Sequence, residues 1–328
     1  MFNAGPGQQA SSDSGPLELI AQARAMAERR GAEEVLLTAA VNESHLLEGA
    51  GEHERAAEAA RRATVSTDAQ LLSRTSGSLL AINEAEPLFA LGRWDEALTV
   101  AGGAMDRYLA PSPMHRALLQ VITGSITLAR GDLAAAAQNV LTARDALRSA
   151  RYEDQHQLPL ARLEILLALE KDGPAAALAA TSQNLDRYDL SSSTPRYAWP
   201  VVAAGASVVL AAAGQAGVAH DERLRDGAAA LTERLRTVAE KLGTFGPAQR
   251  AWQLAFAAAD AHAACCLAAF PAALPAAWAT AEDAGGVPSE PGALLQAWDE
   301  AAAAWAGLSE PYPQAWALLH AAEAIDET

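Results

Sequence analysis

A histidine and a cysteine near the end of the chain have the types and the spacing of metal ligands. His262 and Cys265 are three residues apart, so they would share one face of a helix and could both reach a zinc ion. No further cluster in the sequence completes such a ligand set, so we interpret the pair as packing residues and expect no metal ion and no cofactor. Cys265 and Cys266 are adjacent, a strained geometry for a mutual disulfide, which indicates buried thiols in a reducing, cytoplasmic compartment.

Catalytic and nucleotide-binding motifs are missing from the sequence. It contains no G-x-x-x-x-G-K-[ST] phosphate loop, no G-x-G-x-x-G, no G-x-S-x-G nucleophile elbow and no H-E-x-x-H zinc motif. Acidic pairs such as Asp95-Glu96 and Asp299-Glu300 fall in predicted first helical turns or on surfaces, where a carboxylate favours the helix dipole. We therefore predict that the chain is not an enzyme, and an unrecognised active site stays open as a third hypothesis.

Aromatic side chains gather in the last third of the chain. Five of the seven tryptophans are Trp252, Trp278, Trp298, Trp305 and Trp316. Trp298 and Trp305 are seven residues apart and would share one helical face. The group is either a platform for a flat ligand or a partner helix, or the aromatic core at one end of the fold.

The longest predicted linker, residues 188–199, carries the candidate binding residues. Long ordered loops are often functional, and Arg196, Tyr197 and Trp199 could reach a groove from this one. In the alternative interpretation, the Ser-Ser-Ser-Thr run caps the next helix, and the two aromatic residues staple it.

The charge of the chain excludes some partners. The net charge is −16, and no Lys or Arg follows Arg250, whereas ten Asp and Glu residues lie between Asp260 and Glu327. Nucleic acids and anionic lipids are bound through cationic side chains, so we expect no direct nucleic-acid binding and no membrane binding. The closest approach to a membrane span, residues 201–213, is short and Ala-rich and is predicted to be a buried helix.

An internal repeat of about 40 residues organises the chain. An apolar helix, a glycine turn and an Ala-rich helix recur around Gly51, Gly92, Gly131, Gly173 and Gly214, at intervals of 39 to 42 residues. A leucine precedes each glycine by three or four positions, and a small residue follows about five positions later. The glycine can close a helix in the left-handed conformation, the leucine ends its buried face, and the small residue lets the second helix pack closely.

The repeat predicts an all-α fold, an α-solenoid of tetratricopeptide-like helix pairs. Residues 17–328 would form one continuous array, after a tail of residues 1–16 that is disordered or left over from cloning. The array would start with a leading helix at 17–30. The predicted pairs are 33–49 with 52–67, 69–91 with 93–109, 112–130 with 132–149, 155–171 with 174–187, 195–213 with 218–242, 246–270 with 273–284, and 290–307 with 312–326. Each pair buries its apolar face only by stacking on its neighbours.

Several segments resemble a known family. They are LFALGRWDEAL at 88–98, LARGDLAAA at 128–136, PRYAWPVVAAGA at 195–206 and AWDEAAAAWAGLSEPYPQAWALLHAAEA at 297–324. Together they resemble the helical-repeat region of large ATP-binding LuxR-type (MalT-like) transcriptional regulators. The resemblance implies a solenoid that receives an inducer or a regulatory partner. The phosphate loop and the DNA-reading domain of that family are absent here, and so are the arginines that the family usually carries in its last stretch.

Two functional hypotheses follow. In the first, the chain is the ligand- or partner-sensing module of a LuxR-type regulator, without its own ATPase and DNA-binding domains. A small-molecule effector or a protein would bind in the concave groove and shift the curvature of the stack. In the alternative, the chain is a free-standing scaffold that binds a protein or peptide. Both leave homo-oligomerisation open.

Overall fold

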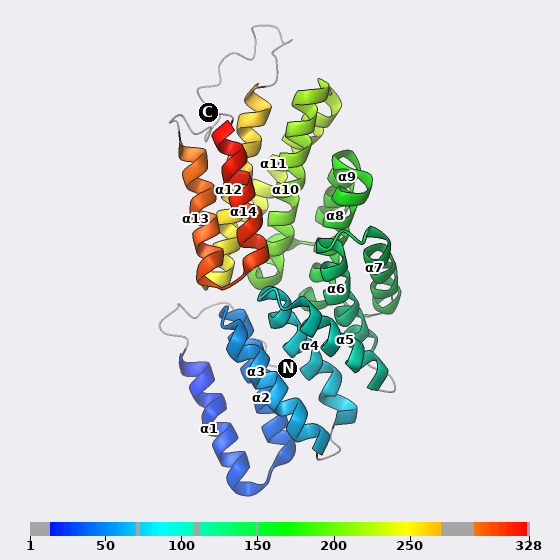
Figure 1. The fold of residues 1–328 in the computed structure, drawn as a ribbon, viewed down its shortest axis with the longest axis vertical. Helices are drawn as coiled ribbons and strands as arrows, with labels where there is room; N and C mark the ends of the chain where they lie inside the picture. Colours follow the sequence, from blue (N-terminus) through cyan, green and yellow to red (C-terminus); the bar gives the residue numbers. More distant parts are fainter. Residues whose placement is uncertain (1–13, 70–72, 108–111, 149, 270–291, 327–328) are drawn as a thin grey trace.

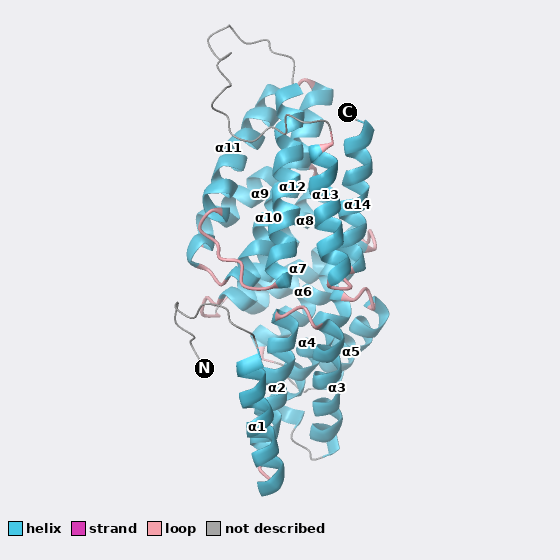
Figure 2. Ribbon diagram, turned by 90° about the vertical axis from the view of Figure 1, so that its left-hand side faces the viewer, coloured by secondary structure: helices cyan, strands magenta, loops and turns pink. Residues whose placement is uncertain are grey.

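The chain is entirely helical over the residues that the structure describes. The computed structural model describes residues 14–69, 73–107, 112–148, 150–269 and 292–326. These segments form fourteen α-helices and one short 3₁₀ helix, and they contain no strand (Figure 1; Figure 2). The α-helices are α1 Ser14–Arg30, α2 Glu33–Gly49, α3 His53–Ala69, α4 Ser73–Ala90, α5 Trp94–Arg107, α6 Pro113–Ala129, α7 Leu133–Leu147, α8 Asp154–Asp172, α9 Pro174–Arg187, α10 Pro195–Ala219, α11 Glu222–Ala239, α12 Pro247–Ala269, α13 Ala293–Gly307 and α14 Pro311–Asp326.

Four of the five predicted turn glycines adopt the left-handed conformation. Their φ angles lie between +73° and +84°, at Gly51, Gly92, Gly131 and Gly173. In the first of these turns the amide of Glu52 donates to the carbonyl of Leu47 at 2.9 Å, and the next two turns repeat this bond across the same spacing. The small residue that follows each turn is fully buried, at Ala56, Ala97, Ala136 and Ala177. The turns at Gly51, Gly92 and Gly131 therefore close the first helix in one common way, whereas Gly173 joins α8 directly to α9 with a ψ of 175°.

The fifth predicted turn is wrong. Gly214 lies inside α10, which continues to Ala219, and the chain turns at His220 with a φ of 53°. The Asp221 carboxylate then caps α11 by accepting hydrogen bonds from the amides of Arg223 and Leu224 at 3.0 and 3.1 Å. A side-chain cap is worth about 1 kcal/mol, similar to the cost of one glycine inside a helix, and the alanines around Gly214 favour continuing the helix. The other predicted helices agree with the structure to within a few residues, except that 273–284 lies outside the described residues.

Helices pack in the order of the sequence. Each helix from α1 to α14 contacts the next one along the chain. The even-numbered helices also contact one another in succession, from α2 through α4, α6, α8 and α10 to α12. They therefore form one continuous layer.

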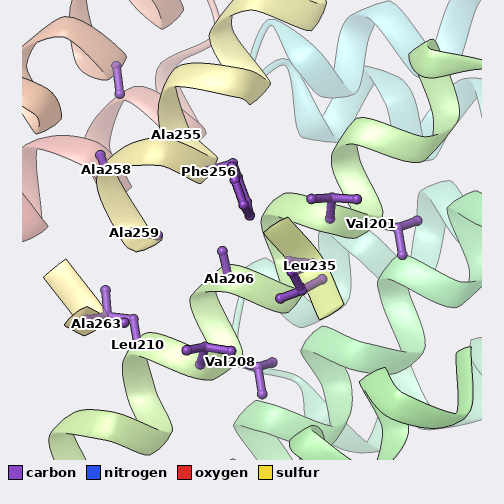
Figure 3. Close-up of a cluster of buried hydrophobic side chains, with 14 of the residues drawn as sticks. Val201, Ala206, Val208, Leu210, Leu235, Ala255, Phe256, Ala258, Ala259 and Ala263 are labelled. Carbon is purple, nitrogen blue, oxygen red and sulfur yellow. The ribbon is translucent and has the colours of Figure 1, made fainter. Parts of the chain in front are cut away.

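The long helix α10 lies at the centre of the largest buried cluster. It contacts α8, α9, α11 and α12, and the small side chains of Ala255, Ala259 and Ala263 on α12 let the two helices approach closely (Figure 3). By length and composition α10 could cross a membrane, but 67% of its most apolar window is buried inside the protein. The prediction of a buried helix at 201–213 is confirmed.

The end of the described chain lies against its beginning. Leu308, just after α13, contacts the turn at Gly51, and Pro311 at the start of α14 lies against the turn at Gly92. Tyr312 meets the Trp94 ring edge-on, with ring centroids 5.5 Å apart. Figure 1 shows α13 and α14 standing above α2 and α3. The row of helices therefore curves back on itself, and residues 308–312 join its two ends.

Replacing Gly51 with alanine is expected to cost more stability than replacing Gly131. Both glycines have left-handed φ angles, so either Cβ strains the backbone by about 1–2 kcal/mol. A Cβ at position 131 meets only open space, whereas one at position 51 meets the Leu308 side chain. Overpacking adds about 1–3 kcal/mol to the second change. Urea unfolding of the two variants measures the difference, and equal losses would contradict the contact between the ends.

Candidate functional site

A cavity of about 860 Å³ lies on the layer of even-numbered helices. Its walls come from α4, α6, α8, α10 and α12, and the α13–α14 segment borders it on the remaining side. This volume lies within the range that small-molecule pockets occupy. A second hollow between α9 and α11 has about 260 Å³ and lacks a comparable apolar wall.

Helical periodicity places the lining residues. Arg162, Leu166 and Glu170 follow one another at four-residue steps along α8. Ala203, Ser207 and Ala211 do the same on α10, and Tyr312, Trp316 and His320 on α14. Residues four apart lie on one face of a helix, so each helix contributes one stripe to the wall.

The stripe on α10 is made of small side chains. Ala203, Ala204, Ala211 and Gly214 line the cavity there, and Leu210 is the one larger apolar residue among them. Small side chains leave room between helices that larger ones would fill. The volume of the cavity thus follows from the alanine-rich composition of its central wall.

Aromatic rings form the wall on the side of the α13–α14 segment. Trp252 of α12 packs edge-on against Trp305 of α13, with centroids 4.7 Å apart, and both line the cavity with Trp316. Trp298 does not line it. This ring is fully buried, stacks on His320 at 4.9 Å and donates from Nε1 to His262 Nδ1 at 3.3 Å.

The two interpretations of the tryptophans therefore apply to different members of the group, and Trp305 belongs to both. Trp298 and Trp305 are core residues, with exposed fractions of 0% and 1%. Trp252 and Trp316 are half-buried and face the cavity together with Trp305. Trp278 lies outside the described residues.

One cationic side chain lines the cavity without a direct ion pair to any described residue. Arg162 of α8 has a buried Nε atom with no hydrogen-bond partner, and we find no ion pair to its guanidinium among the described residues. Its guanidinium carbon lies 5.1 Å from the centroid of the Trp252 ring, a cation–π distance. Burial lowers the pKa of Arg162, which the Tyr312 and Glu310 side chains partly oppose. An arginine nevertheless stays charged in proteins, so the cavity wall carries a positive charge without a direct ion pair to any described residue.

The carboxylates on the cavity wall are held elsewhere or exposed. Glu310 is buried and lies 3.0 Å from His53 Nε2. Glu323 is exposed and lies 2.6 Å from the Nδ1 atom of His320. Glu170 is also exposed, so water screens its charge. None of the three forms an ion pair with Arg162 within the described parts of the chain.

Beside the cavity, a buried histidine joins the two ends of the chain. His53 Nδ1 lies 2.8 Å from the Glu48 carboxylate, and Nε2 lies 3.0 Å from that of Glu310. Burial alone would lower the pKa of His53, but the two hydrogen-bonded carboxylates outweigh it and raise the pKa to about 10. His53 is therefore a charged link between the turn before α3 and the residue that precedes α14.

The predicted binding residues at the start of α10 do not line this cavity. Arg196 donates from Nη1 to the backbone carbonyl of His45 at 3.0 Å, and its Nη2 lies 3.9 Å from the Glu86 carboxylate. Trp199 is 1% exposed and donates from Nε1 to the carbonyl of Gly243 at 3.0 Å. Tyr197 is half-buried beneath the Arg196 guanidinium, 5.4 Å from its ring centroid. Arg196 and Trp199 thus connect α10 to other segments, and binding at these three residues stays a prediction.

The predicted linker 188–199 overlaps the predicted helix 195–213, and the structure starts that helix at Pro195 as predicted. A 3₁₀ helix at Leu190–Ser192 occupies part of the linker. Thr194 takes the N-cap position of α10, but its side chain makes no capping hydrogen bond. The amide of Thr194 instead donates to the Asp154 carboxylate at 2.6 Å.

The candidate metal ligands His262 and Cys265 both lie on α12. His262 is buried and accepts the Trp298 hydrogen bond through Nδ1. Within the described ranges, no three His, Cys, Asp or Glu side chains come close enough together to hold a metal ion.

Sequence reasoning missed Arg162, His53 and Glu310. Arg162 could have been noticed, because it is the single charge between residues 155 and 163 of an otherwise uncharged stretch, with leucines on both sides. His53 and Glu310 carry no such signal, since they are 257 residues apart and meet only when the two ends of the array join.

Comparison with known proteins identified no similar protein. The chain matches no protein-family model, no curated protein and no solved structure.

Proposed function

We propose that this chain is a sensing module that binds a small molecule in the cavity and passes its state to a partner. The observation that carries the proposal is the 860 Å³ cavity with Arg162 unpaired on its wall. In this proposal the helix pairs form a tetratricopeptide-like α-solenoid with a 40-residue period. The module acts by binding, in the cytoplasm, without a cofactor.

The position of the cavity supports signalling. A ligand there would touch α8, α10 and α12 from one side and α14 from the other. The ligand would therefore favour the arrangement in which residues 308–312 join the two ends. Its affinity would be lower when the two ends separate. A ligand shifts a conformational equilibrium by its difference in affinity for the two states. The segment resemblances suggest that the receiver is a LuxR-type regulator whose ATP-binding and DNA-binding parts lie on other domains.

The cavity favours a small molecule over the alternative of a peptide-binding scaffold. The α13–α14 segment covers the side of the cavity that faces away from α8 and α10. A partner helix that entered the cavity would have to lie there. Glu310 and Tyr312 fix that segment to the α2–α3 and α4–α5 turns. A peptide would have to displace these contacts before it could bind.

Filling the cavity is expected to abolish ligand binding without unfolding the protein. Ser207→Trp places an indole into the open volume beside Ala203 and Ala211, whereas Val218→Trp adds the same side chain to an exposed position on the same helix, 87% exposed. A thermal-shift screen of metabolites on the wild type would identify ligands, because a ligand at 100 times its Kd stabilises a protein by about 2.7 kcal/mol.

The two tryptophan variants decide where a hit binds. Calorimetric titration should show binding to the wild type and to Val218→Trp but not to Ser207→Trp. Equal binding to both variants would place the ligand outside the cavity. A screen without hits, together with a stable complex with a peptide or protein, would favour the scaffold.

A further inference from the structure

Arg162 restricts what the cavity can hold. Its Nε is buried without an acceptor, and Trp252 offers the guanidinium a π-face but no negative charge. A desolvated cation without a partner is unfavourable, and an anion that forms two parallel hydrogen bonds with the guanidinium would remove that penalty. An uncharged ligand would leave the penalty in place.

We propose that the cavity binds a small organic anion whose carboxylate pairs with Arg162 and whose apolar body lies along α10. This inference rests on the ligand-binding function proposed above and names the class of ligand. Its chemistry extends to other planar or compact acidic groups, such as a sulfonate, which present the same oxygens to a guanidinium.

None of the carboxylates on the cavity wall forms a direct ion pair with Arg162 within the described ranges, although Glu310 acts on it at longer range. Glu310 lies 3.0 Å from His53 Nε2, and Glu323 lies 2.6 Å from Nδ1 of His320, whose pKa burial lowers. Glu170 lies two turns further along α8, where it is exposed to water. An anion hydrogen-bonded to the guanidinium would be a nearer partner for Arg162 than any of these three groups.

The volume and the walls exclude a bare inorganic ion as the best ligand. An ion the size of phosphate would leave most of the 860 Å³ filled with water. Leu166, Ala203, Ala204 and Leu210 form an apolar surface beside Arg162 and Ser207. Burying a hydrocarbon body against this surface contributes roughly 25 cal/mol for each Å² of apolar area removed from water. The favoured ligand is therefore an amphipathic acid.

Matched acids and amides test the charge requirement. The probes are 2-naphthoate against 2-naphthamide, and decanoate against decanamide, titrated into the full chain and followed by calorimetry and by tryptophan fluorescence. Each pair has nearly the same shape and differs in charge. Because a hydrogen bond to a charged group is stronger than one to a neutral group, we expect at least one acid to bind about tenfold or more tightly than its amide.

Substitutions of Arg162 test whether that preference comes from this residue. Arg162→Met keeps the length of the side chain and removes the charge, and Arg162→Lys keeps the charge without the paired donors. Arg148→Met is the matched control, because its side chain is 80% exposed at the end of α7. The acid-over-amide preference should disappear in Arg162→Met, fall in Arg162→Lys and remain in Arg148→Met.

Stability separates loss of the anion site from loss of the fold. Arg162→Met should melt at the same temperature as the unliganded wild type or higher, because it removes a half-buried charge that has no direct ion pair. Binding of acids and amides with equal affinity, or a preference that survives in Arg162→Met, would overturn the anion inference and leave the cavity function standing. If neither member of either pair bound, and the metabolite screen were also empty, both proposals would be contradicted.

Discussion

Replacing His53 with leucine is expected to lower the free energy of unfolding by about 3–5 kcal/mol. The side chain is 4% exposed, and the Glu48 and Glu310 side chains on either side of it are 12% exposed. The leucine would leave two buried carboxylates without the charge that pairs them. Urea unfolding followed by circular dichroism measures the loss.

A surface ion pair on the same helix provides the control. Arg55 pairs with Glu52 and is 63% exposed, so Arg55→Leu should cost less than about 1 kcal/mol. A loss in His53→Leu no larger than in Arg55→Leu would show that the buried link does not hold the two ends together.

The same link makes stability depend on pH in a defined direction. The pKa of His53 is raised from its usual value near 6.5 to about 10. The folded state thus holds this proton more tightly than the unfolded state does. The stabilisation is complete below pH 6.5 and is lost progressively as the pH rises through 10. The free energy of unfolding of the wild type should fall between pH 7 and pH 10. That of His53→Gln, which has no titrating group at this position, should fall less.

The link also bears on sensing. Glu310 both pairs with His53 and lines the cavity, and Leu308 and Pro311 on either side of it touch the turns at Gly51 and Gly92. A change that weakens the link would release the segment that borders the cavity. We therefore expect His53→Leu to weaken ligand binding as well as the fold.

Local sequence signals were sufficient for most of the helices. The turns at Gly51, Gly92 and Gly131 were predictable because a left-handed glycine and the hydrogen bond across it are properties of a few adjacent residues. The turn at Gly214 was not, since a glycine among alanines can remain helical when a better capping residue, here Asp221, follows. Competition between two local signals decided that boundary.

The site could not be predicted in the same way. The cavity depends on how several helices curve, and the contact of His53 with Glu310 joins residues 257 apart. Periodicity tells which face of a helix is buried, but it does not tell which distant helix covers that face. Arg196 and Trp199 stood out because they lie in a long linker, yet the structure uses them to connect α10 to His45 and Gly243.

Replacing Trp298 with alanine should be the most destabilising change in the aromatic wall. Trp298 is fully buried, stacks on His320 and donates to His262, so truncation should cost about 3–5 kcal/mol. Trp316 is its matched partner. It is half-buried, meets Trp298 edge-on at 5.4 Å and lines the cavity, so Trp316→Ala should cost roughly half as much. Chemical unfolding of both variants measures the two losses.

Ligand affinity should separate the two tryptophans in the opposite order. At a temperature where both variants are folded, Trp316→Ala should weaken binding of an acid found in the screen, because it removes part of the cavity wall. The affinity of Trp298→Ala for the same acid should stay closer to that of the wild type, because the Trp298 ring lies behind that wall. If the two variants lost affinity in proportion to their lost stability, the tryptophans would act only as a core. The opposite ranking of stability and affinity therefore distinguishes an aromatic core from an aromatic wall that contacts ligand.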